Sequence, residues 1–395
     1  MRFFEYIIHL TLKKSIRKGR KVKSQNASIG LAVVGCGNIG RIRGTFAQNY
    51  PGVGWIGLCD IDETVGRKLA EDLKADFFTT DYEELLKRPE VNATIIATLE
   101  HEHVGPMFLA LERGHKIIIE KPLATDPVKS AEILQAIEDG GNDVVVGYTQ
   151  RFRRRFLVAK ETVRSGQLGE ITSATSRAFM NRVAPTTVVA KTEYRARLTP
   201  MVVSGTHTLD IAFWLMGDKK PVEVYARSVE NALVGIGTKD GTFGIFTFDD
   251  GTVWSMSMSW ALPAVWPGAT YSLEIGIIGT GGVLTIDDTH RDLVLATEEG
   301  HPTYRTKMNE KKHVSFLASY PPGDVVMGQV WGPMREETHA WLDRIHTGLE
   351  TPHATAQEGH RNLMMTMAMD LSAKLKKPVS LPVAPEVLND ELPMK

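Results

Sequence analysis

The sequence predicts an α/β protein in two parts: a doubly wound parallel sheet over residues 28–150, and an α+β domain with an open, mainly antiparallel sheet over residues 151–385. In the first part, short β-rich apolar runs alternate with stretches of helical spacing, which is typical of parallel strands joined by right-handed crossovers. In the second part, segments with period-two alternation are joined by short turns, which indicates antiparallel pairing. Residues 386–395 are expected to form a C-terminal tail.

Each element of the first part rests on a local pattern. Val65, Leu69 and Leu73 recur at i, i+4 and i+8, which predicts one buried helix face. Asp126 before Pro127 predicts a helix start, because aspartate caps the first N–H groups and proline fits the first turn. The expected strands are 31–34, 55–59, 93–97, 116–119 and 144–146, and the expected helices are 39–49, 63–73, 104–111 and 127–137.

The second part begins and ends with helical stretches. Between them, alternating segments are separated by turns such as 249–251 and 279–282. The expected helices are 152–165, 207–216, 335–346 and 357–376, and the expected strands are 222–228, 242–248, 253–260, 271–278 and 283–286.

Composition excludes several classes of protein. The 395 residues, 43% of them hydrophobic, suffice for more than one core, and a net charge of −1 gives no support for a nucleic-acid partner. No apolar run is long enough to span a membrane. The two cysteines, Cys36 and Cys59, form no CxxC pair, so we expect neither a disulfide scaffold nor a metal cluster, and a reducing, cytoplasmic location.

Residues 1–27 form a basic leader with its apolar run before its charges, the reverse of a secretory signal. We interpret it as a flexible, solvated extension. A membrane-surface amphipathic helix and an arm that wraps a neighbouring subunit are the alternatives.

Gly35-Cys36-Gly37-Asn38-Ile39-Gly40 follows a predicted strand and opens a predicted helix. Glycines at this spacing allow a tight turn and a close approach of the backbone, and the helix N-terminus offers free N–H groups to a pyrophosphate. The strand–turn–helix context favours a dinucleotide site over a plain turn, so Gly35, Gly37, Asn38, Ile39 and Gly40 are cofactor-binding candidates.

Asp60 ends the second predicted strand. An acid there accepts hydrogen bonds from the ribose hydroxyls of NAD and repels the extra phosphate of NADP, so NAD is favoured and NADP is less expected. The alternative is that Asp60 or Asp62 caps the next helix, and both roles are compatible.

Thr98 ends the strand at 93–97, in a loop that borders the crevice of the sheet. Thr98 and His103 are therefore cofactor-binding candidates. The run His101-Glu102-His103 does not predict a metal site, because adjacent residues point in different directions and the spacing is not HExxH. Capping of the helix entry is the favoured role of these three side chains.

Glu120-Lys121-Pro122 follows the apolar strand 116–119. A lysine at the carboxyl end of a strand, in the sheet that holds a nicotinamide, is placed to handle a proton beside a hydride transfer. Neutral Lys121 could accept a hydroxyl proton, and charged Lys121 could polarise a carbonyl. Pro122 stiffens the backbone there, which argues against an ordinary surface lysine.

His207 and Asp210 begin the predicted helix 207–216 and share one face of it. Histidine has a pKa suited to proton exchange near neutral pH. Taken alone, a histidine at a helix start is more often a hydrogen-bonded structural group.

Together these residues resemble the Gfo/Idh/MocA family of NAD(P)-dependent oxidoreductases over about residues 29–385. Glu120-Lys121-Pro122 is the most specific sign of this resemblance. The segments 114–116, 151–152, 165–170, 358–359 and 372–373 are also similar to the family pattern.

The resemblance implies a Rossmann domain with bound NAD and a second domain whose sheet often forms the oligomer interface, here a homodimer or homotetramer. It implies Lys121 and His207 as catalytic residues, Asp210 as a substrate contact, and Glu120 and Lys121 on the cofactor side. Many members have an aspartate four residues before the histidine, where this chain has Val203. Valine cannot exchange a proton, so a less polar pocket and a substrate that is not a plain polyol are expected. Arginines such as Arg151 offer a partner to an anionic group of a substrate.

We therefore expect an enzyme that transfers a hydride between NAD(H) and a secondary alcohol or carbonyl of a small sugar-like, cyclitol or hydroxylated-acid substrate. A non-redox member that retains NAD for elimination or hydrolysis is one alternative. A non-catalytic NAD(H)-sensing protein is the other.

Overall fold

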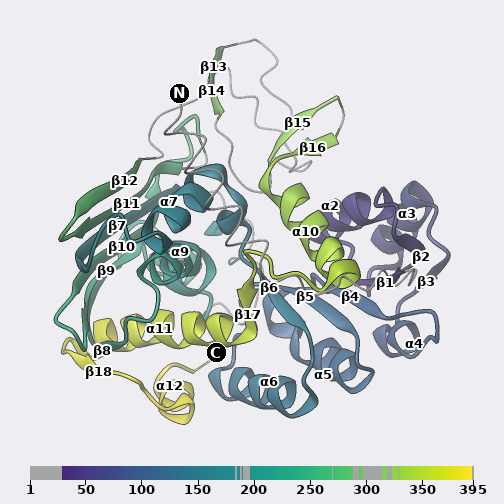
Figure 1. Ribbon diagram of the computed structural model, residues 1–395, viewed down its shortest axis with the longest axis horizontal. Coiled ribbons are helices and arrows are strands. Elements are labelled where there is room, and N and C mark those ends of the chain that lie inside the picture. Colours follow the sequence, from purple (N-terminus) through teal and green to yellow (C-terminus); the bar gives the residue numbers. More distant parts are fainter. Residues whose placement is uncertain are drawn as a thin grey trace, which may run out of the picture.

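The computed structural model describes residues 29–182, 185, 186, 189, 196–268, 270–287, 293–296, 314–317, 323–327 and 329–393, and the basic leader lies outside them. Two seven-stranded sheets stand side by side, with helices between and around them (Figure 1). The expected combination of a parallel and a mainly antiparallel sheet is confirmed.

The first sheet has the strand order β17-β6-β5-β4-β1-β2-β3. Strands β1 to β6 are all parallel, and β17 joins β6 antiparallel. The expected strands formed within a residue or two of their expected ends. Their bounds are β1 Ile29–Val34, β2 Val53–Cys59, β3 Phe77–Thr79, β4 Ala93–Ile96, β5 Lys116–Glu120, β6 Val144–Gly147 and β17 Ala354–Thr355.

Helices cover both faces of this sheet, which is why its central strands are apolar on both sides. Helices α5 (Val104–Glu112) and α6 (Pro127–Gly140) bury one face, and α4 (Tyr82–Leu86) lies beside them. Helices α2 (Asn38–Gln48) and α3 (Glu63–Leu73) bury the other. The late helix α10 (Pro333–Thr347) packs against α2 and adds Trp341 and Leu342 to the same core.

The second sheet has the order β12-β11-β7-β10-β9-β8-β18. All neighbours pair antiparallel except β7 and β10, which are parallel. The interior strand β7, between β11 and β10, is absent from the sequence-based expectation. The bounds are β7 Ile171–Asn181, β8 Pro221–Val229, β9 Gly241–Phe248, β10 Val253–Leu262, β11 Thr270–Gly279, β12 Gly282–Asp287 and β18 Val379–Ser380.

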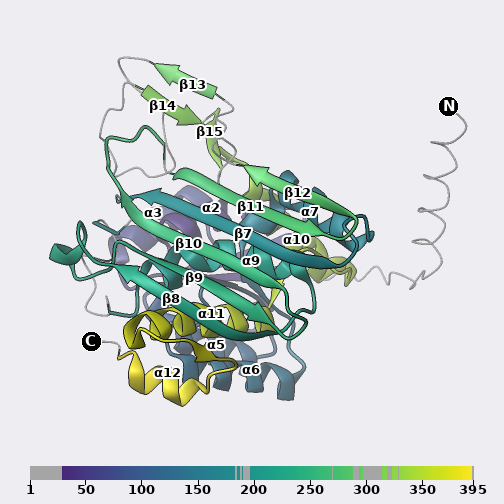
Figure 2. The same cartoon turned by 90° about the vertical axis from the view of Figure 1, so that its left-hand side faces the viewer.

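One face of the second sheet is covered by α7 (Arg154–Arg164), α9 (Thr206–Met216) and α11 (Ala356–Leu375), while the other carries no helix of the described chain (Figures 1 and 2). The covered face buries Phe213 against Phe246, Phe248 and Trp254. Helix α12 (Pro385–Glu391), within the expected tail, packs against α6 and α11 and buries Leu388. The two small hairpins are β13 (Leu293–Ala296) with β14 (Val314–Leu317) and β15 (Asp324–Val326) with β16 (Gln329–Trp331).

Among the described residues, short helical turns also form at η1 (Glu100–Glu102), η2 (Thr149–Phe152), η4 (Met201–Gly205) and η5 (Val234–Ile236). Turn η4 is a π-helical turn that runs directly into α9. Within the described residues, no helix has the length and apolar character that a membrane crossing requires.

Candidate active site

The carboxyl ends of the parallel strands meet at one edge of the first sheet, where open α/β sheets bind their ligands. Strand β1 leads into the glycine loop, β2 ends beside Asp60, β4 ends before Thr98, and β5 ends at Glu120, followed by Lys121. The fold therefore brings most of the predicted site residues to one edge.

Each of the three loop positions is occupied by glycine for a different physical reason. Gly35 has φ +95°, and a Cβ there would lie 2.5 Å from the carbonyl oxygen of Ala97. A Cβ on Gly40 would lie 1.8 Å from the carbonyl oxygen of Gly35, so helix α2 packs directly on the turn. A Cβ on Gly37 would meet no described atom within 4 Å, so internal packing does not require glycine there. Open space at the second glycine is what a pyrophosphate needs for close approach.

Helix α2 begins at this loop without a side-chain cap. Gly37 is its N-cap residue and gives no side-chain hydrogen bond, and Gly37 and Asn38 are both exposed. The first N–H groups of the helix are thus available to an anion. Ile39 is half-buried and packs against the small cluster of Ile42, Phe46 and Met334.

The sequence left open whether Asp60 or Asp62 caps the next helix, and the structure gives the two aspartates different roles. Asp62 caps α3, because its carboxylate accepts from the N–H groups of Thr64 and Val65. Asp60 accepts from the N–H of Cys36 at 2.7 Å and from the N–H of Asp62 at 2.9 Å. It ties the end of β2 to the glycine loop while staying half-exposed at the sheet edge.

The loop after β4 differs in part from expectation. His103 is fully buried, and its Nδ1–H donates to the carbonyl oxygen of Pro122 at 2.8 Å. It is the N-cap residue of α5 but makes no side-chain cap, so the capping role expected for it is wrong. Thr98 stays half-exposed, with its hydroxyl directed to the carbonyl of Leu99. His103 instead links the β4 loop to the segment that carries Lys121.

Lys121 reaches across to the second part of the chain. Its Nζ donates to the backbone carbonyl of Val203 at 3.0 Å. Val203 lies within the π-helical turn η4, and its side chain packs against the core of the second sheet. The turn thus presents a main-chain oxygen to Lys121 at position 203, where many sequences of the Gfo/Idh/MocA pattern have an aspartate. Turns of the π-helical type are frequent at functional sites.

His207 lies one turn further along, at the start of α9. Burial, together with the nearby positive charge of Lys121, lowers the pKa of His207 to about 3. Its imidazole is therefore neutral at physiological pH, and its ring packs edge-on against Tyr148 at 5.9 Å. Its Nδ1 is buried and has no hydrogen-bond partner among the described residues. The structure thus brings Lys121 and His207 together, as expected.

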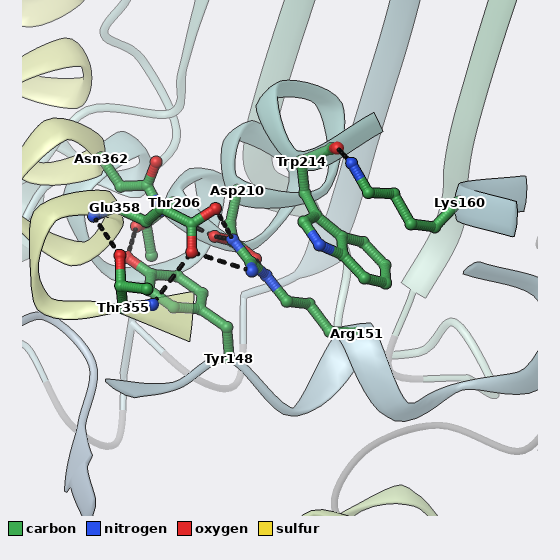
Figure 3. Close-up of polar contacts among 9 residues, drawn as sticks. All are labelled: Tyr148, Arg151, Lys160, Thr206, Asp210, Trp214, Thr355, Glu358 and Asn362. Carbon is green, nitrogen blue, oxygen red and sulfur yellow. Dashed lines mark hydrogen bonds and ion pairs between the residues drawn. The ribbon is translucent and has the colours of Figure 1, made fainter. Parts of the chain in front are cut away.

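Arg151 and Asp210 meet each other inside the protein (Figure 3). Both oxygens of Asp210 accept from the Arg151 guanidinium at 2.7 Å, and Asn362 donates to the same carboxylate at 2.8 Å. Arg151 also binds Glu358, the capping residue of α11. Asp210 and Arg151 are almost completely buried, and no hydrogen bond joins Asp210 to His207.

A second buried ion-pair network was missed by the sequence reasoning. Arg43 of α2, fully buried, donates to Glu120 at 2.5 Å and to Glu337 of α10 at 2.7 Å. A Cβ on Gly147 would lie 2.7 Å from Arg43, so this glycine leaves room for the pair. The signal was available: Arg43 lies among the apolar residues Ile42 and Phe46 of an otherwise buried helix face.

No group of His, Cys, Asp and Glu side chains in the described part of the chain has the arrangement of a metal site. Cys36 and Cys59 are buried free thiols.

The chain belongs to the Gfo/Idh/MocA oxidoreductase family. Residues 29–148 match the NAD-binding Rossmann-fold model of that oxidoreductase family, and residues 156–285 match the model of its C-terminal domain. NAD is accordingly the cofactor, and the open Gly37, the uncapped helix α2 and the acidic end of β2 fit it.

Curated relatives have low sequence identity to this chain, but the matches cover half of it or more. The uncharacterized oxidoreductase YrbE of Bacillus subtilis is 24% identical over 88% of this chain and 95% of its own length. The 2,7-anhydro-N-acetylneuraminate hydratase of Mediterraneibacter gnavus is 23% identical over 71% of this chain and 76% of its own. The inositol 2-dehydrogenase of Salmonella typhimurium is 26% identical over 50% of this chain and 56% of its own.

Solved structures share the whole fold. The scyllo-inositol dehydrogenase of Lactobacillus casei, with bound NAD(H) and scyllo-inositol, aligns with a TM-score of 0.70 and 18% identity. The alignment covers 89% of this chain and 99% of that one.

Proposed function

We propose that this oxidoreductase is an NAD-dependent dehydrogenase or reductase of a secondary alcohol or carbonyl group on a small sugar-like, cyclitol or hydroxylated-acid substrate. The observation that carries the proposal is the contact between Lys121 and the turn before His207, beside the NAD-binding loop. An inositol dehydrogenase among the relatives supports the substrate class.

Lys121 is the proton-handling residue of this proposal. In oxidation, the alcohol O–H bond breaks, its proton passes to neutral Lys121, and the carbon gives up a hydride as the carbonyl forms. When bound, NAD⁺ would accept that hydride in oxidation, and NADH would supply it in reduction. In reduction, charged Lys121 returns a proton to the carbonyl oxygen.

His207 acts in this scheme as a neutral hydrogen-bonding group. With a pKa of about 3 it is a poor proton acceptor, but its unpaired Nδ1 can bind the reacting hydroxyl or carbonyl. We assign Asp210 and Arg151 to positioning: their buried pair, together with Asn362, fixes α9 against α11 and so holds His207 in place.

Substitution of Lys121 tests the assignment. Lys121→Met should abolish turnover while NAD binding, measured by calorimetry, stays largely intact. Lys129→Met is the matched control, because Lys129 is an exposed lysine of α6 that pairs with Glu132. Full activity of Lys121→Met on any accepted alcohol or ketone would sink the assignment.

The hydratase among the relatives favours one second candidate, a non-redox reaction with retained NAD. The near-ultraviolet absorbance of reduced nicotinamide distinguishes the two. A net change during turnover supports the dehydrogenase, and product formation without such a change supports the non-redox reaction.

We also propose a homo-oligomer, a dimer or tetramer, formed through the uncovered face of the second sheet. Tyr225, Phe243, Ile245 and Val253 on neighbouring strands are between 38% and 46% exposed. Tyr225 pairs directly with Ile245 across β8 and β9, and large apolar side chains gathered on an exposed sheet face support a protein–protein interface.

A further inference from the structure

The charge of Lys121 has no acidic side chain to balance it in the part of the chain that the structure describes. Its ammonium donates to a main-chain carbonyl, that of Val203, which carries a dipole but no net charge. The neighbouring side chain of the site, His207, is also uncharged, because burial lowers its pKa.

The carboxylates beside the two site residues in sequence are already committed, and Asp126, five residues after Lys121, caps α6. Glu120, directly before Lys121, binds the guanidinium of Arg43 at 2.5 Å. Asp210 gives both oxygens to Arg151 at 2.7 Å and is fully buried. If either turned to Lys121, a buried arginine would lose one of its two carboxylate partners, Arg43 keeping only Glu337 or Arg151 only Glu358.

The hydrogen-bonding capacity of Lys121 is also incomplete. An ammonium group has three N–H donors, and Val203 takes one of them. The two that remain can serve two acceptors that lie side by side on a ligand. A carboxylate next to a hydroxyl or carbonyl carbon offers such a pair of acceptors, with the negative charge that the site lacks.

We propose that the substrate of this site is a 2-hydroxy acid or the corresponding 2-oxo acid, whose carboxylate pairs with Lys121 while its adjacent oxygen is the reacting group. The proposal rests on the dehydrogenase function proposed above. With the 2-oxo acid, charged Lys121 holds the carboxylate and the carbonyl oxygen and gives that oxygen a proton in reduction. In oxidation of the 2-hydroxy acid, Lys121 has first lost a proton, so the neutral amine accepts the hydroxyl proton while it still donates to the carboxylate. The orphaned Nδ1 of His207 serves the same reacting oxygen.

Binding to a complex that cannot turn over tests this independently of catalysis. An alcohol added to the enzyme saturated with NADH has no hydride acceptor, so calorimetry reports affinity alone. The probes are D-gluconate, D-galactonate and D-glycerate, each compared with its neutral amide. We expect at least one acid to bind about tenfold or more tightly than its amide, because charge-assisted hydrogen bonds are roughly twice as strong as neutral ones.

Two pairs of variants assign the preference to the site. Val203→Asp places a carboxylate beside the ammonium and should abolish the preference for the acid, while Val203→Asn, of the same size without the charge, should keep it. Lys121→Met should also lose the preference, and Lys121→Arg should retain it. Thermal denaturation of each variant, and its affinity for NADH, identify any that fail to fold.

The outcomes separate the two proposals. If no acid binds better than its amide, or if Lys121→Met keeps the preference, the inference about the carboxylate is overturned, even where neutral polyols are oxidised. If acids bind preferentially through Lys121 but no substrate changes the nicotinamide absorbance, the anion site stands and the dehydrogenase function fails.

Discussion

A Cβ on Gly35 or Gly40 would collide with a different neighbour in each case, whereas a Cβ on Gly37 would meet no atom of the described protein within 4 Å. A Cβ at Gly40 would collide with the Gly35 carbonyl, whereas one at Gly37 would enter open space. The demand for glycine at position 37 therefore comes from the ligand, and the demand at position 40 comes from the fold.

Alanine substitutions should separate these two demands. Gly37→Ala should leave the melting temperature unchanged and weaken NAD binding about tenfold or more, because its methyl group fills the space where the pyrophosphate approaches. Gly40→Ala should lower the melting temperature. Gly235→Ala, at another glycine with open space, is the control and should change neither. Unchanged NAD affinity in Gly37→Ala would contradict this account of the loop.

The positions of these residues at the sheet edge could be predicted from the sequence, because each residue ends or follows a recognisable strand. Asp60, Thr98, Glu120 and Lys121 all lie at strand ends, and the sequence shows where strands end. Their partners were not predictable in the same way. That Lys121 binds the Val203 carbonyl, and that Arg151 binds Asp210, depends on how two sheets dock, which local patterns do not encode.

At the scale of elements, the pair of Arg43 and Glu337 joins α10 to α2 across 294 positions of the chain. Both side chains are fully buried, and Thr338 and Thr149 add hydrogen bonds to them. Removal of one partner leaves an uncompensated charge in the interior, which is more costly than loss of the pair itself.

Arg43→Met should lower the free energy of unfolding by about 3–5 kcal/mol, measured by urea denaturation. The double variant Arg43→Met, Glu337→Gln should recover part of that loss, since the orphaned carboxylate is removed. Arg164→Met, which breaks an exposed pair with Glu161, is the control and should change stability by about 1 kcal/mol or less. Equal small losses in both single variants would refute the role given to burial.

Two of the elements that sequence patterns missed, β7 and β17, were missed for different reasons. Strand β7 is an interior strand of the second sheet, yet its inward positions include the small residues Ala174, Ser176 and Ala178. Small side chains leave room for the wide apolar side chains around them, and they remove the contrast on which a period-two pattern depends. Strand β17, two residues long, is too short to give any pattern.

For the molecule as a whole, buried neutral histidines set the response to acid. Burial lowers the pKa of His353 to about 3 and that of His115 to about 4, from the ordinary value of 6.5. The unfolded chain binds protons at these positions below pH 6.5, and the folded chain does not until the pH is far lower. Stability therefore falls as the pH decreases through this window.

We expect each of these two histidines to remove about 2 kcal/mol of stability between pH 6.5 and 5. Denaturant midpoints measured across that range would show the loss, and His115→Gln should make the slope shallower. A midpoint that does not change from pH 7 to pH 5 would be incompatible with neutral, buried imidazoles.

The uncovered face of the second sheet predicts the assembly state. Ile245→Asp places a charge on that face, opposite Tyr225 of the neighbouring strand, and should convert the oligomer to monomers in analytical ultracentrifugation. Val158→Asp, at an exposed apolar position on α7, is the control and should leave the mass unchanged. A monomeric unmodified protein would contradict the proposed interface directly.

The return of the chain to its first sheet has a consequence for how the molecule can be divided. Strand β17 supplies an edge to β6, and α10 covers the face that holds Leu31 and Val33. A fragment that ends at residue 150 would lack both, so its sheet would have an unpaired edge and an uncovered apolar surface. The nucleotide-binding unit is therefore not one continuous segment of sequence, because the last quarter of the chain completes it. Any gene fusion, circular permutation or truncation has to keep both α10 and β17 together with the first sheet.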